Sequence, residues 1–262
     1  MICAGIDSGS RTIKVVLMET EGRRVLAKNI TDQGLKQNEL ASELFENTLR
    51  QSGLERKDIA SIVATGYGRN AIDIADTTIT EITCQCAGVH FLVPHVRTII
   101  DIGGQDSKLI WLDNEGRVRD FAMNDRCAAG TGRFLEIIAR RLDIELESFG
   151  EMAAKSKMPT HISNTCAVFA ETEITGLLAY GTSQDDIAAG IQASIATRIA
   201  GMAGRSVTPP IVFTGGVALI PEMDKALQSV LGNNVTISPD PQMTGALGAA
   251  ILAARKLNGE HK

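Results

Sequence analysis

The stretch that decides the fold reads Ile6-Asp7-Ser8-Gly9-Ser10-Arg11-Thr12-Ile13-Lys14, and a related stretch, Ile100-Asp101-Ile102-Gly103-Gly104-Gln105-Asp106-Ser107-Lys108, follows ninety-four residues later. The correspondence continues without a gap to Arg23 and Arg117, so that seven of the eighteen positions from Ile6 to Arg23 are identical. Each copy has the pattern of a β-hairpin: an apolar strand, an acid, a tight glycine-containing turn and a second apolar strand. An ordinary hairpin needs no aspartate before its turn, so we interpret the pair as an internal duplication and not as chance.

The tips of these hairpins are candidate phosphate sites, because backbone N–H groups of tight turns bind phosphate oxygens. Two facing tips could hold the phosphate chain of a nucleotide from both sides. We expect one side to consist of the N–H groups of Gly9, Ser10, Arg11 and Thr12, and the other of those of Gly103, Gly104 and Gln105.

The aspartate before each turn is a candidate magnesium ligand. Alone, such a residue would form an ordinary Asx turn, but Asp7 and Asp101 occupy equivalent places in a repeat. We expect both to hold Mg²⁺ through its waters, because this ion keeps part of its hydration shell. Lys14 and Lys108 lie in the following strands, and the sequence leaves open whether they act at the site or are solvated.

Composition is that of a globular protein. The 262 residues are 44% hydrophobic and 22% charged, which suits one large or two small domains. A net charge of −5 and an aromatic content of 4% argue against a nucleic-acid partner. The N-terminus lacks a basic region, and the apolar run Ala246–Ala254 is too short to span a bilayer. We therefore expect a cytoplasmic protein with no membrane partner.

Hydrophobic periodicity predicts alternating strands and helices. Strands are expected at 62–65 and 211–213, the latter delivering Gly215 and Gly216. The expected helices run from an Asn38 cap to Gly53, over 82–91, 128–142, 167–180 and 184–203, from Pro221 at a first helical position to Gly232, and through a small-residue segment that begins at Gly245. The duplication suggests a first lobe at 1–95, a second at 96–244 and a C-terminal helix at 245–262 that packs back on the first lobe.

The two hairpins, the strand followed by Thr214-Gly215-Gly216 and the Gly-Ala helix together resemble the superfamily of actin, sugar kinases and heat-shock chaperone ATPases. The resemblance implies an α/β, duplicated ribonuclease H-like fold with two lobes around a nucleotide cleft. It also implies that the hairpins are the phosphate-1 and phosphate-2 loops and that Gly215, Gly216 and Gln242 lie on the nucleoside side. Either Gln105 or Glu81, which stands where the superfamily often carries an acid or amide, would position the attacking water.

Four longer sequence motifs narrow the resemblance from the superfamily to one family. They are Ala64-Thr-Gly-Tyr-Gly-Arg, Asp101-Ile-Gly-Gly-Gln-Asp, Met123-Asn-Asp-Arg-Cys-Ala-Ala-Gly-Thr-Gly-Arg-Phe-Leu-Glu and Cys166-Ala-Val-Phe-Ala-Glu-Thr-Glu. Over essentially the whole chain they resemble the activators of 2-hydroxyacyl-CoA dehydratases and the ATPase subunits of benzoyl-CoA reductase. In that family a homodimer holds one 4Fe-4S cluster, each subunit giving two cysteines, and the matching residues here are Cys127 and Cys166.

The chemistry of the cysteines is consistent with this implication. A 4Fe-4S cluster normally needs four thiolates, which two cysteines per chain supply only in a two-fold dimer. Each of the two also precedes an expected helix, whose N-terminus would favour an anionic cluster. Cys84, Cys86 and Cys3 are interpreted as packing residues.

The resemblance implies an ATP-hydrolysing activator that passes one low-potential electron from a ferredoxin or flavodoxin to a partner iron–sulfur enzyme. A dehydratase, an aromatic-ring reductase and a double-cubane-type reductase are all possible partners, and a heteromer with a paralogous subunit remains open. Two other classes of protein remain as alternatives. A small-molecule kinase would share the hairpins, and a cluster-free regulatory ATPase would keep the nucleotide site and bury the cysteines.

Overall fold

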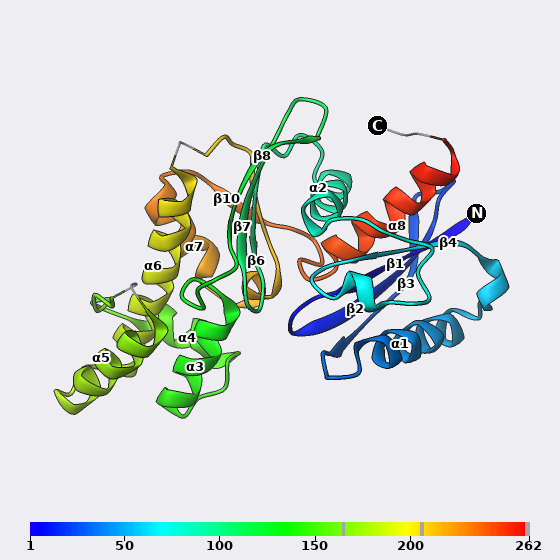
Figure 1. Cartoon of the computed structure of the whole chain (residues 1–262). Coiled ribbons are helices and arrows are strands. Elements are labelled where there is room, and N and C mark those ends of the chain that lie inside the picture. Colours follow the sequence, from blue (N-terminus) through cyan, green and yellow to red (C-terminus); the bar gives the residue numbers. More distant parts are fainter. Residues whose placement is uncertain (164–165, 205–206, 260–262) are drawn as a thin grey trace. The chain divides into compact units, whose positions relative to one another are not determined.

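The computed structural model describes residues 1–163, 166–204 and 207–259, and the chain divides into two compact units. Unit 1 consists of Met1–His95, Leu112–Val118 and Gln242–Lys262, and unit 2 of Val96–Trp111 and Arg119–Pro241. Each unit is built on one five-stranded sheet, and both sheets are labelled in Figure 1.

The sheet of unit 1 has the strand order β3-β2-β1-β4-β5. β1, β2 and β3 form an antiparallel meander, whereas β4 runs parallel to β1 and β5 runs parallel to β4. The strands are β1 (Ile2–Ser8), β2 (Thr12–Glu19), β3 (Arg24–Asp32), β4 (Ile59–Thr65) and β5 (Thr77–Thr78); the α-helices are α1 (Gln37–Ser52), α2 (Glu81–Leu92) and α8 (Thr244–Leu257), with short 3-10 helices η1 (Arg56–Asp58) and η2 (Arg69–Ala71).

Alternate residues of β2 enter different hydrophobic clusters, because successive strand side chains point to opposite faces. Ile13, Val15 and Leu17 pack with α1, whereas Val16 and Met18 pack with α8. α8 also lies so close to β1 and α2 that a Cβ on Gly5 or Gly88 would overlap a backbone oxygen of α8. This close packing places the start of α8 next to the end of β1.

The sheet of unit 2 has the strand order β10-β9-β6-β7-β8. β6 and β7 are antiparallel, and β9 runs parallel to both β6 and β10. The strands are β6 (Thr98–Ile102), β7 (Ser107–Leu112), β8 (Val118–Asn124), β9 (Ile211–Thr214) and β10 (Val235–Ile237); the α-helices are α3 (Gly132–Leu142), α4 (Ser148–Lys155), α5 (Ala167–Ala179), α6 (Gln184–Ala203) and α7 (Met223–Leu231), with a short 3-10 helix η3 (Gly216–Leu219).

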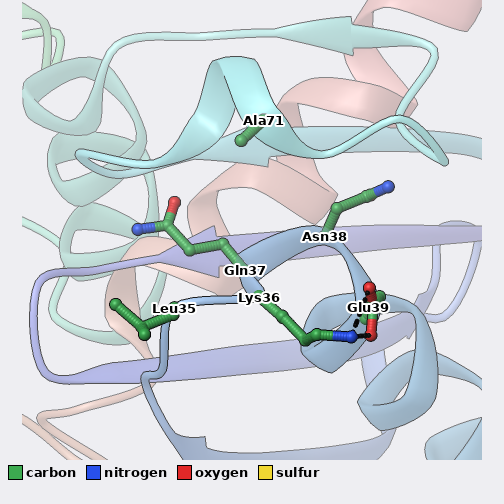
Figure 2. A pocket seen from close by; sticks show the side chains of 6 residues that line it. All are labelled: Leu35, Lys36, Gln37, Asn38, Glu39 and Ala71. Carbon is green, nitrogen blue, oxygen red and sulfur yellow. Dashed lines mark hydrogen bonds and ion pairs between the residues drawn. The ribbon is translucent and has the colours of Figure 1, made fainter.

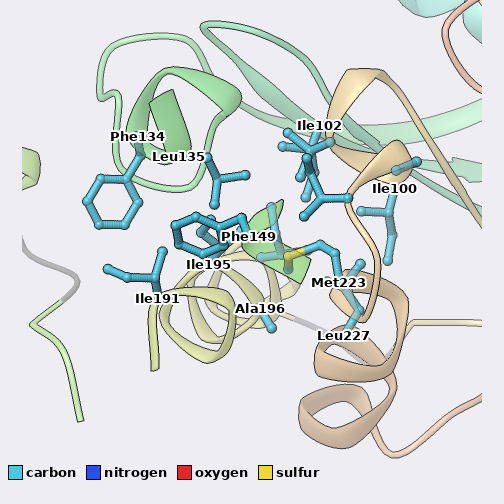
Figure 3. Close-up of a cluster of buried hydrophobic side chains, with 14 of the residues drawn as sticks. Ile100, Ile102, Phe134, Leu135, Phe149, Ile191, Ile195, Ala196, Met223 and Leu227 are labelled. Carbon is cyan, nitrogen blue, oxygen red and sulfur yellow. The ribbon is translucent and has the colours of Figure 1, made fainter. Parts of the chain in front are cut away.

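One large hydrophobic cluster joins the helices of unit 2 to its sheet. Figure 3 shows Phe134 and Leu135 of α3, Phe149 of α4 and Ile191 and Ile195 of α6 in this cluster. All five side chains are fully buried. α3 is thereby fixed against the rest of unit 2, which matters because the loop before α3 carries Cys127.

The predicted duplication is confirmed in the strand registers. Asp7 of β1 lies opposite Lys14 of β2, and Asp101 of β6 lies opposite Lys108 of β7. A parallel strand then lies beside each aspartate: β4 in unit 1 and β9 in unit 2. Two mixed sheets with this shared arrangement confirm the predicted α/β, duplicated ribonuclease H-like fold class.

Several helix signals are confirmed. The helix predicted at 184–203 is α6, and Gly53 and Gly232 end their helices in the left-handed conformation at φ of 71° and 64°. In the part of the chain that the structure describes, no helix is both long enough and apolar enough to cross a membrane.

Three predicted helix starts are wrong. α1 begins at Gln37, and the side chain of Asn38 is bonded to Asp73 instead of capping the helix. α7 begins at Met223, with Glu222 and not Pro221 next to its first residue. α3 begins at Gly132, four residues later than expected, because the preceding residues form a hydrogen-bonded loop.

Candidate functional site

The first candidate turn joins β1 to β2 in unit 1. The N–H of Gly9 donates to the carbonyl of Thr12 at 3.1 Å and closes the turn. Gln33 holds it from the side: its side-chain amide donates to the carbonyl of Gly9 at 2.8 Å, and its backbone N–H donates to that of Arg11 at 2.8 Å. The structure thus uses the Gly9 N–H inside the turn, whereas we expected it to face a phosphate.

The carboxylate of Asp7 lies beside this turn in space that glycines keep open. Lys14 donates to Asp7 Oδ2 at 3.1 Å. A Cβ on Gly245 would lie 3.2 Å from the same oxygen, and a Cβ on Gly66 would overlap the other oxygen. Gly66 also has φ of +87°, which side chains rarely adopt. The glycines therefore let the backbone approach this carboxylate closely, and a side chain at either position would crowd it.

The second candidate turn joins β6 to β7 in unit 2 and is closed by a bond of 2.9 Å from the N–H of Gly103 to the carbonyl of Asp106. The N–H of Gly103, like that of Gly9, is therefore bonded inside its turn, whereas we expected it to face a phosphate. Lys108 Nζ lies 2.7 Å from Asp106 Oδ2 and 3.6 Å from Asp101 Oδ2. Its side chain is only 4% exposed, and that of Lys14 is 13% exposed, so the solvated alternative is wrong for both lysines.

The two turns differ in their charge balance. In unit 1 one lysine faces one aspartate, whereas in unit 2 one lysine is shared by two. The shorter contact shows that Asp106 is the main counter-ion of Lys108. The sequence did not reveal this difference, because Thr12 holds the place of Asp106 in the first copy.

The equivalence of the two units extends to the glycine that follows the parallel strand. A Cβ on Gly215, which follows β9 and has φ of +89°, would lie 2.6 Å from Asp101 Oδ1. Gly66 follows β4 and has the same relation to Asp7. Sequence reasoning singled out Gly215 but missed Gly66, although a Thr-Gly pair follows an apolar strand in both units.

Two of the candidate nucleoside residues, Gly215 and Gly216, lie in unit 2, and Gln242 is the first residue of the C-terminal part of unit 1. The N–H of Gly215 and the hydroxyl of Thr214 both donate to the carbonyl of Pro241, at 2.9 and 2.6 Å. Gly216 begins η3, and Gln242 follows Pro241 directly.

The two candidate water-positioning residues are placed differently. Gln105 is exposed at the tip of its turn. Glu81 is the first residue of α2, where an acid also stabilises the positive end of the helix. Its position therefore has a structural explanation that does not depend on a role in hydrolysis.

Asp7 and Asp101 fit a hydrated Mg²⁺. Both offer carboxylate oxygens, the ligand type this ion prefers. Both also have at least one oxygen over a glycine, where any side chain would fill the space. Lys14 lies 3.1 Å from Asp7 Oδ2, whereas Lys108 lies 3.6 Å from Asp101 Oδ2, so the lysine lies closer to this aspartate in unit 1 than in unit 2.

Cys127 lies in an ordered loop before α3 and is partly exposed. The side-chain amide of Asn124 donates to the carbonyls of Cys127 and Ala129 at 2.9 and 3.2 Å. Thr131 closes the other end, its hydroxyl donating to the carbonyl of Ala128 at 2.7 Å. The expectation that Cys127 directly precedes a helix is wrong, because α3 starts five residues later.

Cys166 is the residue directly before α5 and is partly exposed, so the second helix expectation is confirmed. Val168 and Phe169 in the first turn of α5 are 66% and 67% exposed. Apolar side chains exposed next to a partly exposed thiol are typical of a contact surface. Within residues 1–163, 166–204 and 207–259, no three His, Cys, Asp or Glu side chains gather as a metal site.

Residues 156–158 are anchored to α6 by Asp186. Its carboxylate accepts hydrogen bonds from the Ser156 hydroxyl at 2.6 Å and from the N–H groups of Lys157 and Met158 at 3.1 and 3.0 Å. These bonds, above all that of Ser156, lower the pKa of Asp186 to about 2. Nearer the cysteine, Glu173 of α5 accepts a bond of 2.8 Å from the N–H of Ser163.

Removing this anchor should change stability in a pH-dependent way. Because the pKa of Asp186 is lower in the folded protein than its ordinary value of 3.8, the charged form stabilises the fold. The free energy of unfolding of Asp186→Asn should therefore be lower than that of the wild type at neutral pH, and the difference should shrink as pH falls through about 4 toward 2. Urea unfolding of both proteins from pH 7 downward measures it; a difference that grows toward acid would contradict the assignment.

The other three cysteines are buried, as predicted for packing residues. Burial raises the pKa of Cys84 and of Cys86 to about 12, and it also raises the pKa of Cys3. Cys86 donates through Sγ to the carbonyl of Gly116 at 3.1 Å. Thiols that are held protonated in this way are poor metal ligands.

A cavity of about 320 Å³ that the sequence did not predict lies where α1 begins, beside η2 (Figure 2). It is lined by Leu35, Lys36, Gln37, Asn38, Glu39 and Ala71. Lys36 and Glu39 form an ion pair of 2.8 Å across its wall.

The fold and the paired acidic turns define the class of actin-like ATPases. The model of the BadF/BadG/BcrA/BcrD ATPase family matches residues 4–253, and the chain belongs to this family. The predicted family resemblance is thereby confirmed.

Three relatives show where in the family the chain stands. It is 43% identical to the activator of lactoyl-CoA dehydratase of Anaerotignum propionicum, with 97% of each chain covered. It is 42% identical to the (R)-2-hydroxyglutaryl-CoA dehydratase activating ATPase of Acidaminococcus fermentans, with 96% of each covered, and the solved structure of that component has a TM-score of 0.94. The activator of 2-hydroxyisocaproyl-CoA dehydratase from Clostridium difficile, solved with bound ADPNP, is 38% identical at a TM-score of 0.92, covering 100% and 98% of the chains.

Proposed function

We propose that the protein is an ATP-hydrolysing iron–sulfur activator that passes a low-potential electron to a partner iron–sulfur enzyme. The observation that carries the proposal is the combination, in a member of this ATPase family, of two acidic phosphate-type turns with two partly exposed cysteines. The partner is a 2-hydroxyacyl-CoA dehydratase, since the relatives described above are activators of such enzymes.

The residues proposed to bind ATP belong to the two acidic turns and to the segments that follow β9 and β10. Backbone N–H groups of the turn after β1, at Ser10, Arg11 and Thr12, and of the turn after β6, at Gly104 and Gln105, bind the phosphates. Gly215, Gly216 and Gln242 lie on the nucleoside side. Asp7 and Asp101 hold the waters of Mg²⁺, and Gln105 or Glu81 orients the attacking water.

The cluster is held by Cys127 and Cys166 of two chains. Both thiols are partly exposed, whereas the other three cysteines are buried. Four thiolates ligate a 4Fe-4S cluster, so a two-fold dimer supplies the complete set. When bound, the cluster accepts and releases one electron. The exposed Val168 and Phe169 provide apolar contact area for the second copy, and the N-terminus of α5 places partial positive charge at Cys166.

The donor in this proposal is a cytoplasmic ferredoxin or flavodoxin. ATP acts by binding differently to two conformations of the protein, because a ligand that binds both equally shifts nothing. Hydrolysis then returns the protein to the conformation that ADP favours. The electron therefore moves in one direction only while ATP is consumed.

Composition of the anaerobic protein tests the proposal. Protein purified without oxygen should be brown, elute as a dimer and contain equal amounts of iron and acid-labile sulfide, at about two irons per chain. It should also hydrolyse ATP without an added acceptor. ATPase activity without iron would favour the cluster-free regulatory class, and phosphate transfer to a small molecule would favour a kinase.

A further inference from the structure

α3 begins by donating backbone hydrogen bonds to the turn between β6 and β7. The N–H of Gly132 donates to the carbonyl of Gly103 at 2.9 Å, and that of Arg133 donates to the carbonyl of Gly104 at 2.7 Å. The first N–H groups of a helix have no partner inside the helix and need one outside it. Here the partner is the turn that is proposed to bind phosphate.

The peptide groups of this turn face two ways. In a trans peptide the C=O and the N–H point to opposite sides. Because the carbonyls of Gly103 and Gly104 face α3, the N–H groups of Gly104 and Gln105 in the same two peptides face away from it. These are N–H groups proposed to bind phosphate. Hydrogen bonds that share a peptide group polarise each other, so a phosphate on one side acts on the bond to α3 on the other.

Only a short, internally bonded segment separates α3 from Cys127. Asn124 and Thr131 bond to carbonyls within it, as described above. A segment held by such hydrogen bonds moves as one piece with the start of α3, whereas a flexible linker would absorb the displacement. A shift of the start of α3 therefore reaches the cysteine.

We infer that Gly132 is a positioning residue that couples the phosphate turn to Cys127, an inference that rests on the proposed function of the turn. A Cβ on residue 132 would lie 3.1 Å from the carbonyl oxygen of Gly103 and 3.3 Å from the Cα of Gly104. A side chain would therefore require the turn or the helix to shift by a few tenths of an ångström. Glycine permits the contact, and its N–H makes one of the two bonds.

Two substitutions weaken this joint without removing a proposed ligand-binding group. Gly132→Ala adds only the Cβ. Gly132→Pro also removes the N–H, at a first helical position where proline is favoured. Thr131 before it is extended, with φ of −130° and ψ of 170°, as a residue before proline requires. Gly201→Ala is the matched control, because a Cβ on this helical glycine of α6 meets nothing within 4 Å.

The measurement uses the full chain freed of iron, so that it does not depend on the cluster. Iodoacetamide labels Cys127 and Cys166 in the same sample, and mass spectrometry gives the ratio of their rates with ADP and with a non-hydrolysable ATP analogue. In the wild type and in Gly201→Ala the ratio should change between the nucleotides by about fivefold, the lower end for coupled sites. In both Gly132 variants it should stay constant while calorimetry shows that both nucleotides still bind.

A wild-type nucleotide response in Gly132→Ala and Gly132→Pro would overturn the inference and leave the proposed function standing. A wild type that binds both nucleotides without any change of the ratio would also overturn it. A wild type that binds neither nucleotide would instead contradict the proposed function. If the proline variant does not fold, the alanine variant decides.

Discussion

Replacement of Cys127 or of Cys166 by serine should leave anaerobically purified protein without a 4Fe-4S cluster. Each ligand is used twice in the proposed dimer, so one substitution removes two of four thiolates, and a hydroxyl does not replace a thiolate on iron. Iron should fall from about two atoms per chain to nearly none. The dimer should weaken as well, since the cluster links the two chains.

Cys86→Ser is the matched control. Its thiol donates to the carbonyl of Gly116, and a serine hydroxyl can make the same bond. Iron and sulfide analysis with gel filtration should therefore give wild-type values for this variant. Full iron retention in Cys127→Ser or Cys166→Ser would contradict the ligand assignment, and iron loss in Cys86→Ser would show that the assay reports stability and not ligation.

Local patterns predicted the hairpins and several helix ends. An aspartate, a glycine and a lysine at fixed spacing specify a strand, a turn and a facing strand, and Asp7 and Lys14 do lie opposite each other. Gly53 and Gly232 end helices because glycine, which has no Cβ, adopts the left-handed conformation without steric cost. Such features depend on neighbours in sequence and can be read from it.

The helix starts were predicted wrongly where a residue at the start bonds to a residue far away in the sequence, or where it has an unexpected backbone conformation. Asn38 is an ordinary capping residue, but Asp73 competes for its side chain. Ala128 and Ala129 are good helix formers, but Gly130 has φ of +88°. α3 therefore starts later, where its N–H groups meet Gly103 and Gly104. The helix after Pro221 starts only at Met223, because Glu222 has φ of +68° and is not helical. Tertiary hydrogen bonds or local geometry outweighed propensity in each case.

The pairing of the charged residues at the site could not be predicted from the sequence either. Lys108 and Asp106 are two residues apart in the second copy, and only the depth of burial and the distances show that they pair. Likewise, Gly66 joins the site because β4 lies beside β1, a pairing between distant segments. Asp7, Asp101 and Gly215 could be listed from the sequence, but their partners could not.

Asp101→Asn should lower ATP hydrolysis by about 10- to 100-fold, the usual cost of losing a residue that holds a metal through its water shell. Asp7→Asn should also lower the rate, but its effect on metal affinity should be smaller. Lys14 pairs with Asp7 at 3.1 Å, whereas Lys108 is closer to Asp106 than to Asp101, so the lysine competes less with a cation at Asp101 than at Asp7. Binding of Mn²⁺ in the presence of ADP, followed by electron paramagnetic resonance, measures the affinity without turnover.

Asp106→Asn tests whether the lysine pairs set the metal affinity, because this substitution leaves the Asp101 carboxylate in place. Without Asp106, Lys108 should pair with Asp101, and Mn²⁺ affinity should fall although Asp101 is still present. Asp120→Asn, an exposed acid on β8, changes the same charge in unit 2 and should leave the affinity unchanged. If Asp7→Asn weakens Mn²⁺ binding more than Asp101→Asn does, the metal is held mainly in unit 1. The lysine pairs then do not decide where it binds.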